Sequence, residues 1–287
     1  MAEKDIKSKI LMSYADVFAD CINTLVYGGR QRLNEENTHR APTESFYKGK
    51  GEQNQFCDVG RYLIEESSIL VEYIIENELR PKERQVIRKI SYQGGAYRQQ
   101  LESGERVYPV ICIVLAWTGK TNRIPLSLHQ LLEKNGALSE DIEYVDDAKL
   151  MIYRMNNLSE EVRERFVSDV GFVADYLNEG SFDRRKGQRI VHMEALCDMM
   201  EALTGDKRFT EMAEKFVERQ QKGDVIIMCE YIDALEARGE AKGEKKGEAR
   251  LAALLEKLYD LGRREEAEQA VRNPDVRTRL YKEFCII

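Results

Sequence analysis

The sequence predicts an α/β fold followed by an all-helical C-terminal extension, and two patterns lead to this prediction. Up to about residue 150, apolar runs of strand length alternate with segments whose apolar residues recur at helical spacing. From about residue 158 onward, helical spacing continues almost without interruption. We therefore expect an α/β domain over 1–150, a helical extension over 151–230 and a charged helical tail over 231–287.

The first half of the α/β domain is predicted to contain one helix and three strands. Apolar residues at helical spacing predict a helix over 8–26 that ends at Gly28-Gly29. The polar stretch "RQRLNEENTHRAP" that follows predicts a loop. Three extended segments come next, at 44–48, 56–64 and 69–76.

The second half is predicted to hold a helix, a buried strand and two shorter elements. Helical spacing resumes after Pro81 and continues to Leu101. The uninterrupted apolar run "VYPVICIVLAW" predicts a central strand that is covered on both faces. A short helix, "LSLHQLLEK", and a strand, "IEYVDD", are expected after it.

Composition restricts the class of protein. Hydrophobic residues make up 43% and charged residues 33% of the 287 residues, and no apolar run approaches the roughly 20 residues that span a bilayer. The six cysteines are scattered, which argues against a zinc knuckle or a disulfide scaffold. The N-terminus has no apolar signal core, so we expect a cytoplasmic protein without a membrane partner. Because the net charge is −7, a DNA partner requires a local basic face.

Acidic residues gather at the ends of two strands that are predicted to be neighbours. In "SILVEYIIENELR", Glu76 and Glu78 end an apolar run, and strand alternation turns both to one face. An antiparallel pairing through the turn "EESS" would bring Asp58 near Glu76. Such like charges repel and raise a carboxyl pKa, whereas Mg²⁺ prefers hard oxygen ligands. The pattern indicates a Mg²⁺ (or Mn²⁺) site with Asp58 and Glu76 as ligands and Asp16 as a further candidate.

Each of these residues also has a plainer interpretation. Glu76 and Glu78 would suit a solvated sheet edge that discourages aggregation, and Asp16 would suit an exposed helix position. A second basic stretch, "DRRKGQR" at 183–189, suits a loop between helices better than a phosphate contact.

Several segments, in their order along the chain, carry a resemblance to a known family. They are "YADVF", "GGRQ", "CDVGRYL", "IIENE", "VIRKISYQGGAY", "YPVICIVLAW", "SLHQLL", "IEYVDDAKL" and the Gly- and Glu-rich "ARGEAKGEKKGEAR". With the order helix, three strands, helix, strand, they resemble the PD-(D/E)XK nuclease core. More narrowly, they resemble the bacterial family of recombination-promoting nucleases and transposase-related proteins.

The resemblance implies a Mg²⁺-dependent DNA endonuclease, a hydrolase linked to DNA recombination or mobile elements. Asp58 takes the place of the first-strand metal ligand and Glu76 that of the second acid. Glu78 stands where the family usually has Gln, and would orient the attacking water. This departure keeps open an alternative, a catalytically degenerate scaffold that acts as a DNA-binding or protein-interaction module.

The helix after the acids is expected to contact the DNA substrate. Arg88 and Tyr92 match the family's R-x-x-x-Y pattern and share one helix face, and Arg84 lies one turn before them. Arg88 would neutralise a phosphate, or would instead form a structural ion pair with Glu76 or Asp16 through space. The basic residues of this region are Arg80, Lys82, Arg84, Arg88, Lys89 and Arg98.

The tail is expected to be a solvated helical connector over "ARGEAKGEKKGEAR", followed by about 30 amphipathic residues. These last residues could form a small helical module or the seam of a homo-oligomer.

Overall fold

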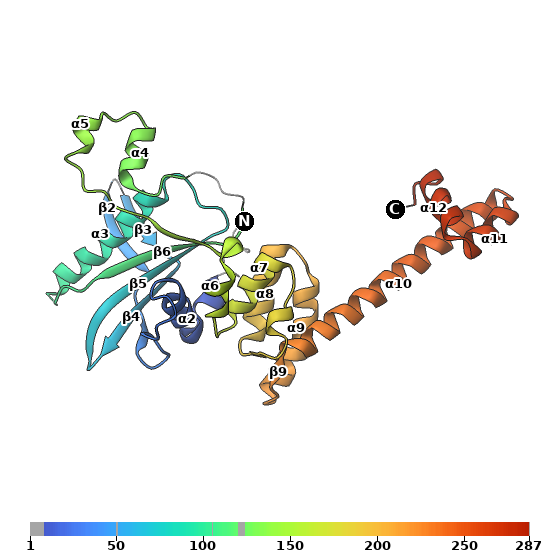
Figure 1. Ribbon diagram of the computed structural model, residues 1–287, viewed down its shortest axis with the longest axis horizontal. Coiled ribbons are helices and arrows are strands. Elements are labelled where there is room, and N and C mark those ends of the chain that lie inside the picture. Colours follow the sequence, from blue (N-terminus) through green and yellow to red (C-terminus); the bar gives the residue numbers. More distant parts are fainter. Residues whose placement is uncertain (1–8, 50, 105, 120–123, 287) are drawn as a thin grey trace. The chain divides into compact units, whose positions relative to one another are not determined.

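The computed structural model describes residues 9–49, 51–104, 106–119 and 124–286 (Figure 1). The chain divides into two compact units, one that extends to Met228 and one over Cys229–Ile287. Each unit is described by itself.

The first unit contains a five-stranded mixed sheet in the order β1-β4-β5-β6-β7. The strands are β1 (Thr38–Arg40), β4 (Val59–Glu65), β5 (Ser68–Glu78), β6 (Val110–Ala116) and β7 (Met151–Arg154). β1, β4 and β5 pair antiparallel, whereas β5, β6 and β7 pair parallel. The predicted α/β class is therefore confirmed, and the apolar run of β6 lies inside the sheet as expected.

Helices lie on both faces of this sheet (Figure 1). On one face, Tyr92 and Ala96 of α3 (Gln85–Ser103) pack with Ile74 of β5 and with apolar residues of β6. On the other face, α2 (Ala15–Leu25) presents the ring of Phe18 to the guanidinium of Arg61. Strand alternation explains the division, because residues 72, 74, 76 and 78 of β5 face α3 and the residues between them face α2.

Three local predictions differ from the structure. The expected loop at 30–42 contains β1, which is short and polar but pairs with β4 through Thr38↔Leu63. The predicted strand at 44–48 exists as β2 (Glu44–Gly49), yet it pairs with β3 (Gly51–Phe56) in a separate hairpin. The predicted strand "IEYVDD" is wrong: Ile142 is buried at the end of α5 (Ser139–Ile142), and Tyr144 is 90% exposed in the turn that follows.

The remaining elements of the first unit are mostly short helices. They are α4 (Leu128–Lys134), η1 (Met155–Asn157), α6 (Glu160–Glu164), α7 (Val170–Glu179), η2 (Asp183–Arg185), β8 (Arg189–Ile190), α8 (Met193–Thr204), α9 (Arg208–Gln221) and β9 (Ile226–Ile227). The buried carboxylate of Asp20 in α2 accepts hydrogen bonds from the backbone N–H groups of Val167 and Ser168, at 3.0 and 2.8 Å. The expected division at residue 150 thus falls inside one compact unit, just before a strand of its sheet.

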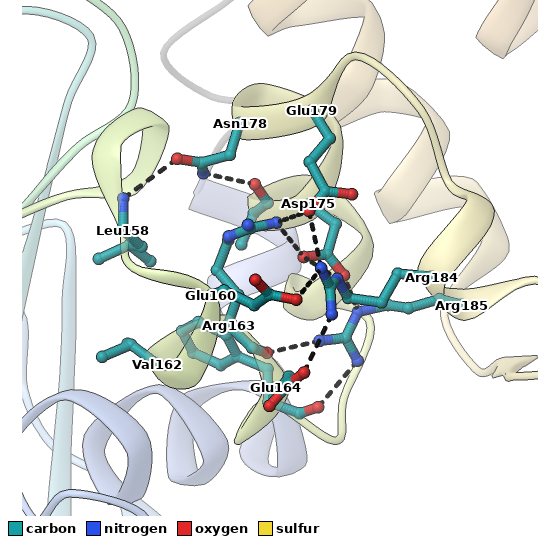
Figure 2. A network of polar contacts seen from close by, with 12 residues as sticks. Leu158, Glu160, Val162, Arg163, Glu164, Asp175, Asn178, Glu179, Arg184 and Arg185 are labelled. Atoms are coloured by element: carbon teal, nitrogen blue, oxygen red, sulfur yellow. Dashed lines mark hydrogen bonds and ion pairs between the residues drawn. The ribbon is translucent and has the colours of Figure 1, made fainter.

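An ion network with a buried centre joins α6, α7 and η2 (Figure 2). Asp175 is fully buried, and its two carboxylate oxygens lie 2.8 Å from Arg163 Nη1 and 2.5 Å from Arg185 Nε. Arg184 pairs with Glu160, Glu164 and Glu179. Arg184 and Arg185 therefore connect helices, in agreement with the loop interpretation.

The second unit is helical. Its elements are α10 (Met228–Asp260), α11 (Arg264–Arg272) and α12 (Pro274–Glu283). Helix α10 begins one residue before the unit itself, which starts at Cys229. The Gly- and Glu-rich stretch lies inside α10 without a break in the helix. Leu254, Leu258, Ala267, Ala270 and Leu280 form a small core. In the part of the chain that the structure describes, no helix is long and apolar enough to cross a membrane.

Candidate functional site: an acid cluster at the end of β5

The antiparallel pairing of β4 and β5 brings Asp58 and Glu76 together. The last residue pair of these two strands is Val59 with Ile75. Asp58 directly precedes Val59 and Glu76 directly follows Ile75, so the two acids lie opposite each other. The backbone N–H of Asp58 donates to Glu76 Oε1 at 3.2 Å, and the N–H of Asn77 donates to Asp58 Oδ2 at 2.7 Å. Each carboxylate is thus held by the backbone of the other segment, and this exchange fixes their spacing.

Burial has a large effect on the pKa of Glu76. Its side chain is only 1% exposed, whereas those of Asp58 and Glu78 are 11% and 15% exposed. Desolvation by burial, followed by the charge of Asp58, raises the pKa of Glu76 from 4.5 to about 7. Arg88 and the N–H of Asp58 act in the opposite direction. Glu76 can therefore gain or lose a proton near neutral pH.

Arg88 of α3 bridges the two glutamates of β5. Its Nη2 lies 2.7 Å from Glu76 Oε2, and its Nη1 donates to Glu78 Oε1. Arg88 also donates to the Tyr92 hydroxyl at 3.0 Å. Although burial opposes it, the hydrogen bond to Tyr92 and the charges of both glutamates raise the pKa of Arg88. The structural ion pair that the sequence left open, Arg88 with Glu76, is the one that forms.

Lys9 is a member of the cluster that the sequence analysis missed. Its Nζ lies 2.7 Å from Asp58 Oδ1. No sequence signal indicates this contact, because Lys9 lies in a short helical segment over residues 9–12, far from Asp58 along the chain. With Lys9 and Arg88 in place, all four carboxylate oxygens of Asp58 and Glu76 have an N–H partner.

Glu72 is a second buried carboxyl on this face of β5. It lies two residues before Ile74, so strand alternation places both on the same face, and it is 6% exposed. Burial raises the pKa of Glu72 from 4.5 to about 7. The same alternation that places Glu76 and Glu78 on one face could have identified it.

The other predicted site residues lie apart from the acid pair or at its edge. Asp16 binds His192 Nε2 through both carboxylate oxygens, at 2.8 and 2.9 Å, and no contact in the described residues joins it to Asp58. Burial opposes the effect, but the hydrogen bond to His192 lowers the pKa of Asp16. Arg84 lies just before α3 and is exposed, and among the described residues no hydrogen bond or ion pair joins its side chain to the cluster.

The donor chemistry of the cluster suits a hard divalent cation, but protein cations hold its oxygens in this structure. Asp58, Glu76 and Glu78 offer the oxygen ligands that Mg²⁺ prefers. Within the described ranges, however, no group of three or more His, Cys, Asp or Glu side chains is arranged to hold a metal. The sequence analysis used repulsion between the acids to argue for a metal, whereas here Arg88 and Lys9 offset that charge.

Comparisons of the chain with protein-family models, with curated proteins and with solved structures found no match.

Proposed function

We propose that the chain is a Mg²⁺-dependent DNA endonuclease with a PD-(D/E)XK-type core, linked to recombination or mobile elements. The observation that carries this proposal is the exchange of hydrogen bonds that fixes Asp58 beside Glu76. Its setting also supports the proposal: apart from the separate hairpin β2-β3, helix α2, antiparallel strands β1, β4 and β5, helix α3 and parallel strand β6 come in the order helix, three strands, helix, strand. The first of these strands, β1, is not one of the three that the sequence predicted.

Asp58 and Glu76 would hold the ion, which would supply an activated water and offset negative charge on the phosphodiester. On binding the ion, Asp58 would give up its ion pair with Lys9, and Glu76 would give up its ion pair with Arg88. Because a proton on Glu76 competes with any cation, we expect metal binding to strengthen as pH rises through about 7.

The neighbouring side chains have roles that follow from their exposure. Glu78, which is 15% exposed, would orient the attacking water at the edge of the cluster. Arg88 is 39% exposed, so its guanidinium can reach both the carboxylates and a phosphate outside them. Tyr92 would hold Arg88 through its hydroxyl, and Arg84 would contact the DNA backbone.

A second candidate is a non-catalytic DNA-binding or protein-interaction module built on the same scaffold. The complete pairing of the acids with Lys9, Arg88 and backbone N–H groups favours it, because such a cluster is a sufficient structural ion network by itself.

Nicking of supercoiled plasmid DNA separates the two candidates. The assay compares the wild-type chain with Asp58→Asn and Glu76→Gln, with and without Mg²⁺ or Mn²⁺. Glu140→Gln, an exposed residue of α5, is the matched control. The endonuclease proposal expects metal-dependent nicking by the wild type and the control, and its loss in both site variants. Wild-type protein that never nicks DNA would support the interaction module, and nicking that survives both substitutions would exclude the acids as the site.

A further inference from the structure

A cavity of about 350 Å³ lies at the carboxyl ends of the parallel strands. Ala116, the last residue of β6, pairs with Glu78 of β5 on one side and with Arg154 of β7 on the other. Arg80 follows β5 by two residues, and both Arg80 and Arg154 line the cavity. In mixed α/β sheets, ligands bind preferentially in such crevices at the carboxyl ends of parallel strands.

The charge of this cavity is one-sided. Its lining in the described residues includes two guanidinium groups and no carboxylate. No ion pair to Arg80 or Arg154 is present in the part of the chain that the structure describes, in contrast to the paired Arg88 and Arg184. Two cations that share a small cavity repel, and an anion between them would remove that repulsion.

The frame of the cavity is held by hydrogen bonds between strand ends. The N–H and hydroxyl of Thr118 both donate to the carbonyl of Leu79, at 3.0 and 2.9 Å. Asn156 Nδ2 donates to the carbonyl of Gly119 at 3.2 Å. These bonds tie the segment after β6 to those after β5 and β7, next to both arginines, and such preorganisation lowers the entropic cost of binding.

The chemistry of the lining favours a phosphate. The planar guanidinium forms paired hydrogen bonds with phosphate oxygens, and arginine is the preferred residue for this recognition. Pro81 and Ala116 add an apolar wall, against which the organic part of a ligand can pack. The volume lies at the lower end of the range for small-molecule sites, which extends from roughly 300 to 1,000 Å³.

We propose that this cavity, the Arg80–Arg154 pocket, binds a phosphate monoester no larger than a mononucleotide. The phosphate can belong to a free nucleotide or to the phosphorylated end of a DNA strand, because both present the same group. This site adjoins the acid cluster, since Ala116 pairs with Glu78, but its described lining contains no carboxylate and its binding does not depend on a metal.

Calorimetric titration of the full chain, without divalent metal, tests the proposal. The probes are inorganic phosphate, 2′-deoxyadenosine 5′-monophosphate and unphosphorylated 2′-deoxyadenosine. We expect the monophosphate to bind and the nucleoside not to bind. Arg154→Gln should weaken binding of the monophosphate at least tenfold, and Arg80→Gln/Arg154→Gln should abolish it.

Two variants outside the pocket serve as controls for the loss of binding. Arg189→Gln removes one exposed charge from β8, away from the pocket, and should bind the monophosphate as the wild type does. Glu140→Gln changes an exposed residue of α5 and should also bind the monophosphate as the wild type does. Because the titration contains no divalent metal, failure of the endonuclease proposal would leave this result unchanged. Thermal unfolding of each variant checks that it is folded.

Binding of two short oligonucleotides that differ only in a 5′-phosphate distinguishes the two sources, a free nucleotide and the end of a DNA strand. Preference for the phosphorylated strand identifies a DNA end as a ligand, and equal affinity for both assigns the pocket to free nucleotides. The proposal is overturned if no phosphate probe binds at millimolar concentration, or if the double variant binds the monophosphate as tightly as Arg189→Gln does.

Discussion

Titration of Glu76 is expected to make the first unit less stable as pH rises. Burial and the charge of Asp58 raise the pKa of Glu76 from 4.5 to about 7 in the folded chain. The folded state therefore retains a proton that the unfolded chain has released. This contribution to stability is fully present below about pH 4.5 and is lost as pH rises through about 7.

The magnitude follows from the two pKa values. At about 1.4 kcal/mol per pKa unit, the difference between 4.5 and about 7 corresponds to roughly 3 kcal/mol of unfolding free energy. About 2.5 kcal/mol of it falls between pH 5 and pH 8.5. Glu76→Gln removes this titration but leaves that of Glu72, so the two proteins should differ by this amount in their pH dependence.

The single tryptophan provides the assay. Trp117 is fully buried in the first unit, and its Nε1 donates to Asn77 Oδ1 at 3.1 Å, next to Glu76 in sequence. Urea unfolding followed by tryptophan fluorescence at pH 5 and pH 8.5 therefore reports this unit alone. Glu140→Gln should retain the wild-type pH dependence. If Glu76→Gln also retains it, Glu76 does not titrate near neutrality and the reasoning is refuted.

Two further predictions concern the buried ion network. Asp175→Asn should lower the free energy of unfolding by about 3–5 kcal/mol, because it leaves the guanidinium groups of Arg163 and Arg185 without their buried counterion. Urea unfolding measures this loss, and a value below about 1 kcal/mol would show that solvent screens the network. Gly171→Ala should cost about 1–3 kcal/mol, because the new Cβ would lie 2.5 Å from the guanidinium carbon of Arg185. Gly187→Ala, where nothing lies within 4 Å, is the control, and equal stability of the two variants would contradict the packing argument.

The parts of the site that follow strand alternation could be predicted from the sequence. Period-2 alternation placed Glu76 and Glu78 on one face, and an antiparallel pairing placed Asp58 beside them. Lys9 could not be predicted, because its contact joins two residues that are far apart in sequence and no local pattern links them. Repulsion among acids predicts a countercharge but does not specify whether a metal or an arginine supplies it.

The two wrong predictions about local structure, at β1 and at "IEYVDD", also arise because contacts distant in sequence decide the outcome. Local pattern fails where tertiary pairing decides, as it does for the polar strand β1, which forms because β4 offers it an open edge. In "IEYVDD" the apolar and polar residues alternate, but only Ile142 is buried, so the segment turns instead of pairing.

Binding of Mn²⁺ at pH 8 tests most directly whether Asp58 and Glu76 form a metal site. At this pH Glu76 is mostly ionised, since its pKa is about 7. Electron paramagnetic resonance counts the free ion in titrations of the wild type, Asp58→Asn and the control Glu140→Gln. The account predicts one bound ion per chain in the wild type and the control, and none in Asp58→Asn at the same concentrations. Equal binding by Asp58→Asn and the wild type, or no binding by either, would contradict it.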